Sequence, residues 1–176
     1  MLCYNWSMKL IILRGLPGCG KSTIAEYLSK KLGCDVIYGD FFKREFVKNN
    51  TNFKSEDIYN YAHNKILEEL ENAFNEKKEV LIIEELFENK NFVEDVKSFC
   101  NKNKIEIKWF YIQRDLEKLL ETENNRERKV KNTLDDFKKL KEDLDSIKNE
   151  WEIKVDNNGI IEESVSFILE KLQNKQ

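Results

Sequence analysis

The sequence predicts an α/β protein in which a parallel β-sheet is covered by helices on both faces. Short apolar strands alternate with segments of helical periodicity along the chain, and the strands are apolar at most positions. Strands of that composition are typical of sheets buried on both faces. A length of 176 residues fits one domain, which we expect to span residues 8–176 after an N-terminal extension of residues 1–7.

Five segments have the composition of such strands, and they lie at residues 8–13, 35–39, 79–84, 105–112 and 151–155. Right-handed crossovers between parallel strands place every carboxyl end at the same edge of the sheet. Ligands of such sheets bind just beyond that edge. The residues that follow each strand are therefore the first candidates for function.

The segments between the strands carry apolar residues at helical spacing, within residues 24–32, 55–77, 90–101, 116–120, 132–149 and 161–172. Ser55 is the expected N-cap of the second helix, and Asp115 is the expected cap of the fourth. Phenylalanines and basic residues are interleaved over residues 40–54. That stretch fits an amphipathic helix with its rings in the core, and the alternative is a surface that stacks bases and holds phosphates.

Residues 15–23, which we call the glycine-rich loop, carry the strongest functional signal. They separate the first strand from the first helix and include three of the six glycines and the only proline of the chain. Glycine allows positive φ and close approach to a ligand, so that successive N–H groups point at phosphate oxygens in front of a helix N-terminus. We expect nucleotide to be bound here by Gly15, Pro17, Gly18, Cys19, Gly20, Lys21, Ser22 and Thr23.

A magnesium site is expected beside this loop. Lys21 would reach the β- and γ-phosphates, and the Ser22 hydroxyl would complete the shell of a Mg²⁺ ion. Glu84, at the end of the third strand, is the candidate carboxylate on the metal side, acting directly or through a bound water. Glu85 follows it at once, and the sequence leaves open which of the two serves the metal.

Asp40 follows the second strand and is the candidate catalytic base. The single histidine of the chain, His63, falls inside a predicted helix as a surface or packing residue, so a carboxylate is the expected proton acceptor. A general base of this kind contributes about 10²–10⁴-fold to the rate. The alternative is that Asp40 caps the next helix.

Residues 123–131 are expected to form a short basic lid over the nucleotide. The stretch has no apolar periodicity and includes two of the five arginines, Arg126 and Arg128. The planar fork of arginine matches phosphate oxygens, and closure of a basic segment excludes water and neutralises developing charge. Both arginines are therefore candidate catalytic residues, and the alternative is a solvated helical face in a lysine-rich chain.

Composition and charge limit the partners, metal sites and cellular location that we expect for the protein. A net charge of −3 gives no global attraction to nucleic acid or to an anionic membrane, no stretch approaches the roughly 20 apolar residues of a membrane span, and residues 1–8 do not have the pattern of a signal peptide. The four cysteines and one histidine make no recognisable zinc site. Reduced thiols in a cytoplasmic protein are the expectation.

Cys19 lies close to Lys21 at the start of the first helix, where the pKa of a thiol can be lowered. A reactive thiol is therefore one interpretation of this position. The other is a plain loop position at which serine would serve equally well.

Together these features resemble the small P-loop kinases of the nucleoside-monophosphate-kinase-like group, in the branch with polynucleotide 5′-kinases, zeta toxins and chloramphenicol phosphotransferases. The resemblance is carried by residues 13–23, Asp40, the strand end at 81–84 and the basic segment at 126–128. It implies a three-layer α/β/α P-loop NTPase fold with five parallel strands in the order 2-3-1-4-5, ATP as the donor and Mg²⁺ as the metal. In the polynucleotide-kinase branch an arginine lies three positions after the aspartate; here that position is Lys43, which weakens the case for a 3′-phosphate contact.

The function expected from these residues is the transfer of the γ-phosphate of ATP to a hydroxyl of a small-molecule acceptor. A nucleic-acid 5′-end kinase is the nearest alternative, and we favour it less. A regulatory module that binds or hydrolyses ATP without an acceptor is the alternative from another class. The chain has no Asn-Lys-x-Asp motif for guanine, so a GTPase is not expected.

Overall fold

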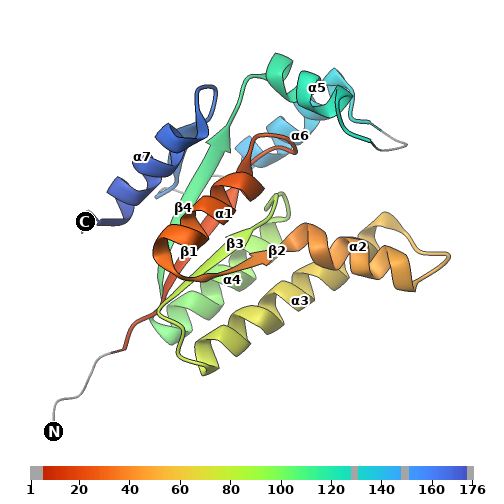
Figure 1. The fold of residues 1–176 in the computed structure, drawn as a ribbon. Helices are drawn as coiled ribbons and strands as arrows, with labels where there is room; N and C mark the ends of the chain where they lie inside the picture. The colour runs from red at the N-terminus through yellow and green to blue at the C-terminus, as the bar shows by residue number, and fades with distance from the viewer. Residues whose placement is uncertain (1–5, 128–130, 148–150, 174–176) are drawn as a thin grey trace, which may run out of the picture.

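The computed structural model describes residues 6–127, 131–147 and 151–173, and Figure 1 shows how the elements are arranged. The strands are β1 (Lys9–Arg14), β2 (Asp35–Tyr38), β3 (Val80–Glu84), β4 (Glu106–Gln113) and β5 (Ile153–Asp156). The helices are α1 (Lys21–Leu32), α2 (Gly39–Asn49), α3 (Ser55–Asn75), α4 (Lys90–Asn103), α5 (Leu116–Asn124), α6 (Leu134–Ser146) and α7 (Ile161–Gln173).

The strands form one parallel sheet in the order β2-β3-β1-β4-β5. The predicted fold class and the strand order implied by the resemblance are therefore confirmed, and each strand begins and ends within two residues of its expected limits. In the register of the sheet, Glu84 of β3 lies opposite both Leu13 of β1 and Tyr38 of β2. Three strands thus end at one level, which brings together the segments that follow them.

Helices cover both faces of this sheet, and β1 shows why. Its side chains are buried on both faces: Ile11 and Leu13 belong to one hydrophobic cluster, and Leu10 and Ile12 to the other. The first cluster is completed mainly by α1 and α7, with Leu119 from α5 and with Phe137 and Leu144 from α6. The second is completed by α3 and α4. A strand that buries alternate side chains on opposite faces must be apolar throughout, as the sequence indicated.

Three helix starts differ from the sequence expectation. α3 begins at Ser55 itself, and the Asp57 carboxylate accepts a hydrogen bond from the Lys54 backbone N–H at 2.8 Å, so Ser55 is not the N-cap. Asp115 is the N-cap of α5, but its carboxylate accepts from the Asn158 side chain and does not cap the helix. Asp40 lies in the first turn of α2, after the N-cap Tyr38, so the alternative role of Asp40 as an N-cap is wrong.

The aromatic and basic stretch after β2 forms α2 and the turn to α3, and the two helices extend beyond the sheet (Figure 1). The Phe46 ring lies 5.2 Å from the Tyr61 ring and 5.5 Å from the Phe53 ring, which ties α2 to α3. The prediction of an amphipathic helix with its rings in the core is therefore confirmed only in part, because the rings of Phe42, Phe46 and Phe53 are half-buried. Phe41 is the exception, because 61% of its surface is exposed. None of the helices in the described residues is long and apolar enough to cross a membrane.

Candidate active site

The glycine-rich loop turns from the end of β1 into α1, and its glycines adopt conformations that other residues rarely adopt. Gly15 has a φ of 147°, and a Cβ at this position would collide with the carbonyl oxygen of Ile112 in β4. Gly20 has a φ of 97°, and a Cβ there would collide with the Asn157 amide. Only glycine fits both the backbone angle and the space at these two positions.

This loop fits a chain of phosphates. The first N–H groups of α1 have no partner within the helix, and the helix dipole adds partial positive charge at the same end. Gly15, Gly18 and Gly20 all have positive φ, so the backbone curves into a concave nest in front of the helix. These donors are the chemistry that a triphosphate requires.

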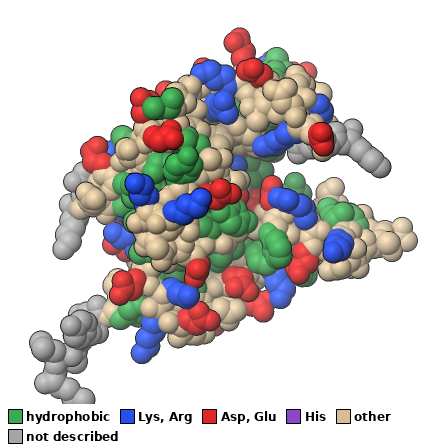
Figure 2. Space-filling model, in the orientation of Figure 1, with side chains coloured by type: hydrophobic (Ala, Val, Ile, Leu, Met, Phe, Trp, Pro, Cys, Tyr) green, Lys and Arg blue, Asp and Glu red, His purple; other side chains and the backbone are tan. Residues whose placement is uncertain are grey.

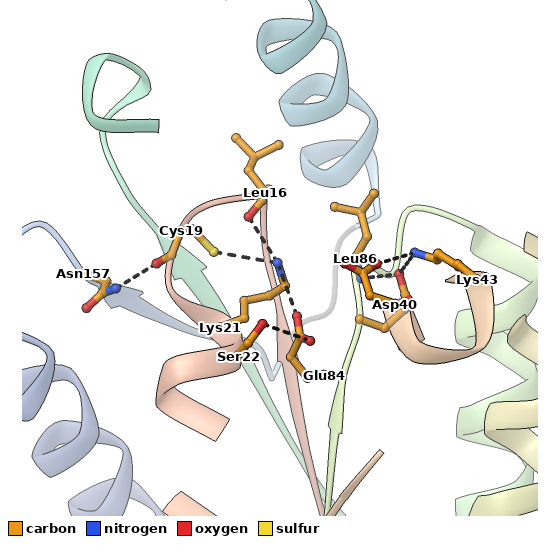
Figure 3. Close-up of polar contacts among 10 residues, drawn as sticks. Leu16, Cys19, Lys21, Ser22, Asp40, Lys43, Glu84, Leu86 and Asn157 are labelled. Atoms are coloured by element: carbon orange, nitrogen blue, oxygen red, sulfur yellow. Dashed lines mark hydrogen bonds and ion pairs between the residues drawn. The ribbon is translucent and has the colours of Figure 1, made fainter. Parts of the chain in front are cut away.

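Lys21, Ser22 and Glu84 meet at the floor of the loop, as predicted (Figure 3). The Lys21 ammonium donates to the Leu16 carbonyl at 3.1 Å and lies 3.6 Å from Glu84 Oε1. The Ser22 hydroxyl donates to Glu84 Oε2 at 3.3 Å. A hydroxyl and a carboxylate side by side are suitable ligands for Mg²⁺, which takes few protein ligands and keeps several waters.

Electrostatics hold Lys21 in its charged form. Burial by itself lowers the pKa of Lys21, but the Cys19 sulfur and the Glu84 carboxylate outweigh burial and raise that pKa above its usual value. Burial raises the pKa of Glu84, against the opposing effect of the Lys21 ammonium. Lys21 is therefore a cation at neutral pH, aimed where phosphate charge would lie.

Asp40 borders the same site. Its carboxylate is 68% exposed and lies 3.5 Å from the Lys43 ammonium. A cavity of about 700 Å³ lies beside it, lined by Ser22, Glu26, Tyr38, Asp40, Phe41, Arg44, Glu45, Lys48, Asn49 and Glu84. Asp40 therefore shares one cavity with the hydroxyl and the carboxylate of the expected metal site.

Glu84 and Glu85 have different surroundings, which separates the two candidates for the metal. Glu84 contacts Ser22 and Lys21. Glu85 accepts hydrogen bonds from Lys43 at 2.5 Å and from the Leu86 backbone N–H at 2.7 Å. The pleat of the strand turns consecutive side chains apart, so Glu84 is the one beside the glycine-rich loop.

The lid region is partly described. Arg126 Nη1 lies 3.4 Å from Glu123 Oε2, and Glu123 Oε1 accepts a hydrogen bond from the Asn132 backbone N–H at 2.8 Å. The buried Glu123 thus joins the two ends of the segment between α5 and α6. Arg126 contacts Glu123 rather than the glycine-rich loop, and Arg128 lies outside the described residues.

Two residues that hold the loop were not assigned a role from the sequence. Arg114, which follows β4, donates from Nη1 to the Gly18 carbonyl at 3.3 Å. Asn157, which follows β5, donates from Nδ2 to the Cys19 carbonyl at 2.7 Å and accepts from the Ser164 hydroxyl at 2.8 Å. The signal that could have found them is their position directly after a strand.

Cys19 does not match the interpretation of a reactive thiol. The side chain is fully buried, and burial raises the pKa of its thiol above the usual value. A buried, protonated thiol is a poor nucleophile. Cys19, Cys34 and Cys100 are free cysteines, and Cys3 lies outside the described residues.

Replacing Asn157 by alanine tests whether the loop is held in place from β5. The change leaves the buried Cys19 carbonyl without its partner, so we expect a loss of about 1–3 kcal/mol in the free energy of unfolding. We also expect weaker nucleotide binding, because the loop loses an anchor. Urea denaturation and calorimetric titration with Mg·ATP measure the two effects. Asn72→Ala, at an exposed position of α3, is the matched control. Unchanged nucleotide affinity in Asn157→Ala would contradict the anchoring role.

Comparison with known proteins places this geometry in a family. A family model described as an AAA domain matches residues 11–133. No curated protein sequence matches the chain. A tunicamycin resistance protein from Deinococcus radiodurans has a similar structure, with a TM-score of 0.72 and 16% identity over 96% of this chain and 97% of that one.

Two further solved structures have the same fold. A sugar kinase from Janibacter aligns with a TM-score of 0.69 and 16% identity, covering 94% of both chains. A deoxyadenosine kinase from M. mycoides with bound dATP aligns with a TM-score of 0.63 and 16% identity, covering 94% of this chain and 100% of that one. At these identities the likeness concerns the fold.

Proposed function

This chain belongs to the AAA domain family and has the fold of the small P-loop kinases, and on that basis we propose that it is an ATP-dependent phosphotransferase. The γ-phosphoryl group of ATP would pass to a hydroxyl of a small-molecule acceptor. The observation that carries this proposal is the shared cavity, which is lined by Asp40 and by the pair formed by Ser22 and Glu84. Kinases among the similar structures support it.

Each residue has a role that follows from its place. The glycine-rich loop and Lys21 bind the triphosphate and hold its negative charge. Ser22 and Glu84 would hold Mg²⁺, which when bound neutralises charge on the β- and γ-phosphates. Asp40 accepts the proton of the acceptor hydroxyl as its oxygen bonds to the γ-phosphorus and the bond to ADP breaks. Arg126 and Arg128 are proposed to close over the phosphates when the lid moves.

The direct test is transfer of labelled γ-phosphate from ATP to members of a metabolite library. We expect a labelled acceptor, formed only with Mg²⁺ present. A regulatory ATP-binding module would instead bind nucleotide and hydrolyse it slowly, unstimulated by any acceptor. That result would contradict the proposal.

A nucleic-acid 5′-end kinase is less well supported by the cavity. Arg44 and Lys48 line it with the exposed ring of Phe41, but four carboxylates line it too, from Glu26, Asp40, Glu45 and Glu84. A surface with more acids than bases is poorly suited to a polyanion. An oligonucleotide acceptor would show a KM that rises steeply with salt concentration.

Replacing Glu84 by glutamine tests the metal site. The amide keeps the size of the side chain but loses the charge that faces Ser22, so we expect the affinity for Mn²⁺ to fall about tenfold, the typical effect of losing one charged contact. Mn²⁺ binding in the presence of ADP can be followed by electron paramagnetic resonance, without any turnover. Glu85→Gln is the matched control, because Glu85 contacts Lys43 instead. A larger loss in Glu85→Gln than in Glu84→Gln would contradict the assignment.

A further inference from the structure

Beside Asp40, on the side of α2 that faces α3, lies a polar group that the proposed reaction does not use. We call it the Glu85 cluster, and its members are Lys43, Tyr59, His63, Glu85 and Glu88. Lys43 Nζ lies 2.5 Å from Glu85 Oε1, 3.5 Å from Asp40 Oδ1 and 5.1 Å from the centre of the Tyr59 ring. Figure 3 shows Lys43 directed toward Asp40 and the Leu86 backbone. The cluster is therefore joined to the candidate base through one ammonium group.

Three buried atoms of this cluster have no hydrogen-bond partner among the described residues: Glu85 Oε2, Glu88 Oε2 and His63 Nε2. The residues Glu85 and His63 are only 3% and 7% exposed. A buried polar atom without a partner is costly, and folded proteins keep few of them. Three such atoms in one cluster indicate that a bound ligand supplies the hydrogen-bond partners that they lack.

The free oxygen of Glu85 lies against the start of α2. A Cβ on Gly39 would overlap with Glu85 Oε2, so this oxygen lies directly against the first residue of α2. Gly39 is the immediate neighbour of Asp40. Lys43 Nζ contacts both Glu85 Oε1 and Asp40 Oδ1, so the two carboxylates share one ammonium group and lie within the span of one small molecule.

The charge of the cluster selects between classes of acceptor. Carboxylates come from Asp40, Glu84, Glu85 and Glu88, whereas the cations paired with them among the described residues are Lys21 and Lys43. Burial lowers the pKa of His63, so the imidazole adds no positive charge at neutral pH. An anionic group on the acceptor needs an available arginine or lysine, and here it would meet carboxylates. Hydroxyl and amino groups donate hydrogen bonds, which free carboxylate oxygens accept.

We propose that the Glu85 cluster selects the acceptor, and that the acceptor is a neutral or amino-substituted polyhydroxyl compound without a phosphate or carboxylate at the end it presents to the cluster. This inference rests on the proposed phosphotransfer. One hydroxyl gives its proton to Asp40 and takes the phosphoryl group, and neighbouring hydroxyl or amino groups donate to Glu85 Oε2 and Glu88 Oε2. His63 Nε2 pairs with a further hydroxyl.

Calorimetric titration tests this class directly. The protein, loaded with Mg²⁺ and a non-hydrolysable ATP analogue, is titrated with hexoses, pentoses and cyclitols, each in neutral, amino, carboxylate and phosphate form. We expect at least one neutral or amino compound to bind ten times more tightly than its anionic forms. Preference for an anionic form, or no binding of any neutral or amino compound at millimolar concentration, would overturn the inference. Binding without transfer of labelled phosphate would keep the inference and contradict the kinase proposal, so the two failures can be told apart.

Two variants locate the binding to the cluster. Glu85→Gln and His63→Phe are expected to weaken binding of the preferred compound about 10- to 100-fold, the effect of losing a hydrogen bond to a buried or charged group, with the affinity for ATP unchanged. The ring centres of His63 and Phe92 are 4.0 Å apart, and His63→Phe keeps an aromatic ring in this stack while it removes the unpartnered nitrogen. Its melting temperature should therefore be unchanged or higher, and it remains informative if Glu85→Gln folds poorly. Glu71→Gln, on the exposed side of α3, is the control. Unchanged binding in His63→Phe and Glu85→Gln would mean that the cluster only supports the fold.

Discussion

Replacing Asp40 by asparagine is expected to lower kcat by about 10²–10⁴-fold, the usual contribution of a general base. The amide has the same shape and still lies at the start of α2, but it cannot take the proton of the acceptor hydroxyl. Because the Asp40 carboxylate is 68% exposed, the substitution should leave the free energy of unfolding nearly unchanged. ATP binding should be spared, since the contacts that we assign to the triphosphate come from the glycine-rich loop.

The measurement is steady-state transfer of labelled phosphate, with calorimetric titration of Mg·ATP for the binding step. Asp35→Asn is the matched control, because Asp35 begins β2 at the opposite end of the strand and its carboxylate pairs with Lys78. A kcat within tenfold of the unsubstituted protein would show that Asp40 is not the base. Loss of ATP binding together with turnover would assign Asp40 to the nucleotide site instead.

The positions of the site residues along the chain explain why most of the fold could be predicted. Leu10 to Leu13 are apolar without interruption because each face of the sheet is covered, and the same pattern marks β3. Parallel strands with right-handed crossovers leave one edge for chemistry. Asp40, Glu84 and the glycine-rich loop could therefore be grouped from sequence order alone, and the register of β1, β2 and β3 brings them to one level.

Side-chain direction could not be predicted in the same way. Glu84 and Glu85 are chemically identical in the sequence, and only the pleat at the end of β3 turns one toward Ser22 and the other toward Lys43. Ser55 and Asp115 have the composition of caps, yet Asp57 accepts a hydrogen bond from the Lys54 N–H at the start of α3, and the Asp115 carboxylate accepts from the Asn158 side chain instead of capping α5. These side-chain contacts depend on residues that are distant in the sequence, and local propensity does not take such residues into account.

The contacts of the His63 side chain could not be predicted from the sequence either. Its place in a predicted helix indicated a packing residue, and its ring does stack on Phe92. The unpartnered nitrogen near Glu85 becomes visible only when α3 and the segment after β3 are placed side by side. The face drawn in Figure 2 is hollowed between the part that contains α5 and α6 and the part that contains α2, with acidic and basic side chains at its edge.

Replacing Lys21 by methionine is expected to have the second large effect. The Lys21 ammonium is buried against Glu84 at 3.6 Å and is the cation at the floor of the glycine-rich loop. We expect the affinity for Mg·ATP to fall about 10- to 100-fold, as for the loss of a charged hydrogen bond. We expect kcat to fall by a further factor of about 10²–10³, as when one stabilising donor is removed from a transition state. Calorimetric titration and single-turnover transfer of labelled phosphate separate the two losses.

Stability has to be measured alongside, because the substitution leaves the Glu84 carboxylate buried without its cation. Breaking a buried ion pair from one side costs about 3–5 kcal/mol, although Glu84 keeps its hydrogen bond from Ser22. The double variant Lys21→Met, Glu84→Gln removes the unpaired charge and should recover stability without recovering ATP binding. Lys30→Met, on the exposed side of the same helix, controls for the loss of a lysine. If folded Lys21→Met protein took up Mg·ATP as tightly as the unsubstituted protein, the glycine-rich loop would not be the nucleotide site, and the roles assigned to Ser22, Glu84 and Asp40 would lose their foundation.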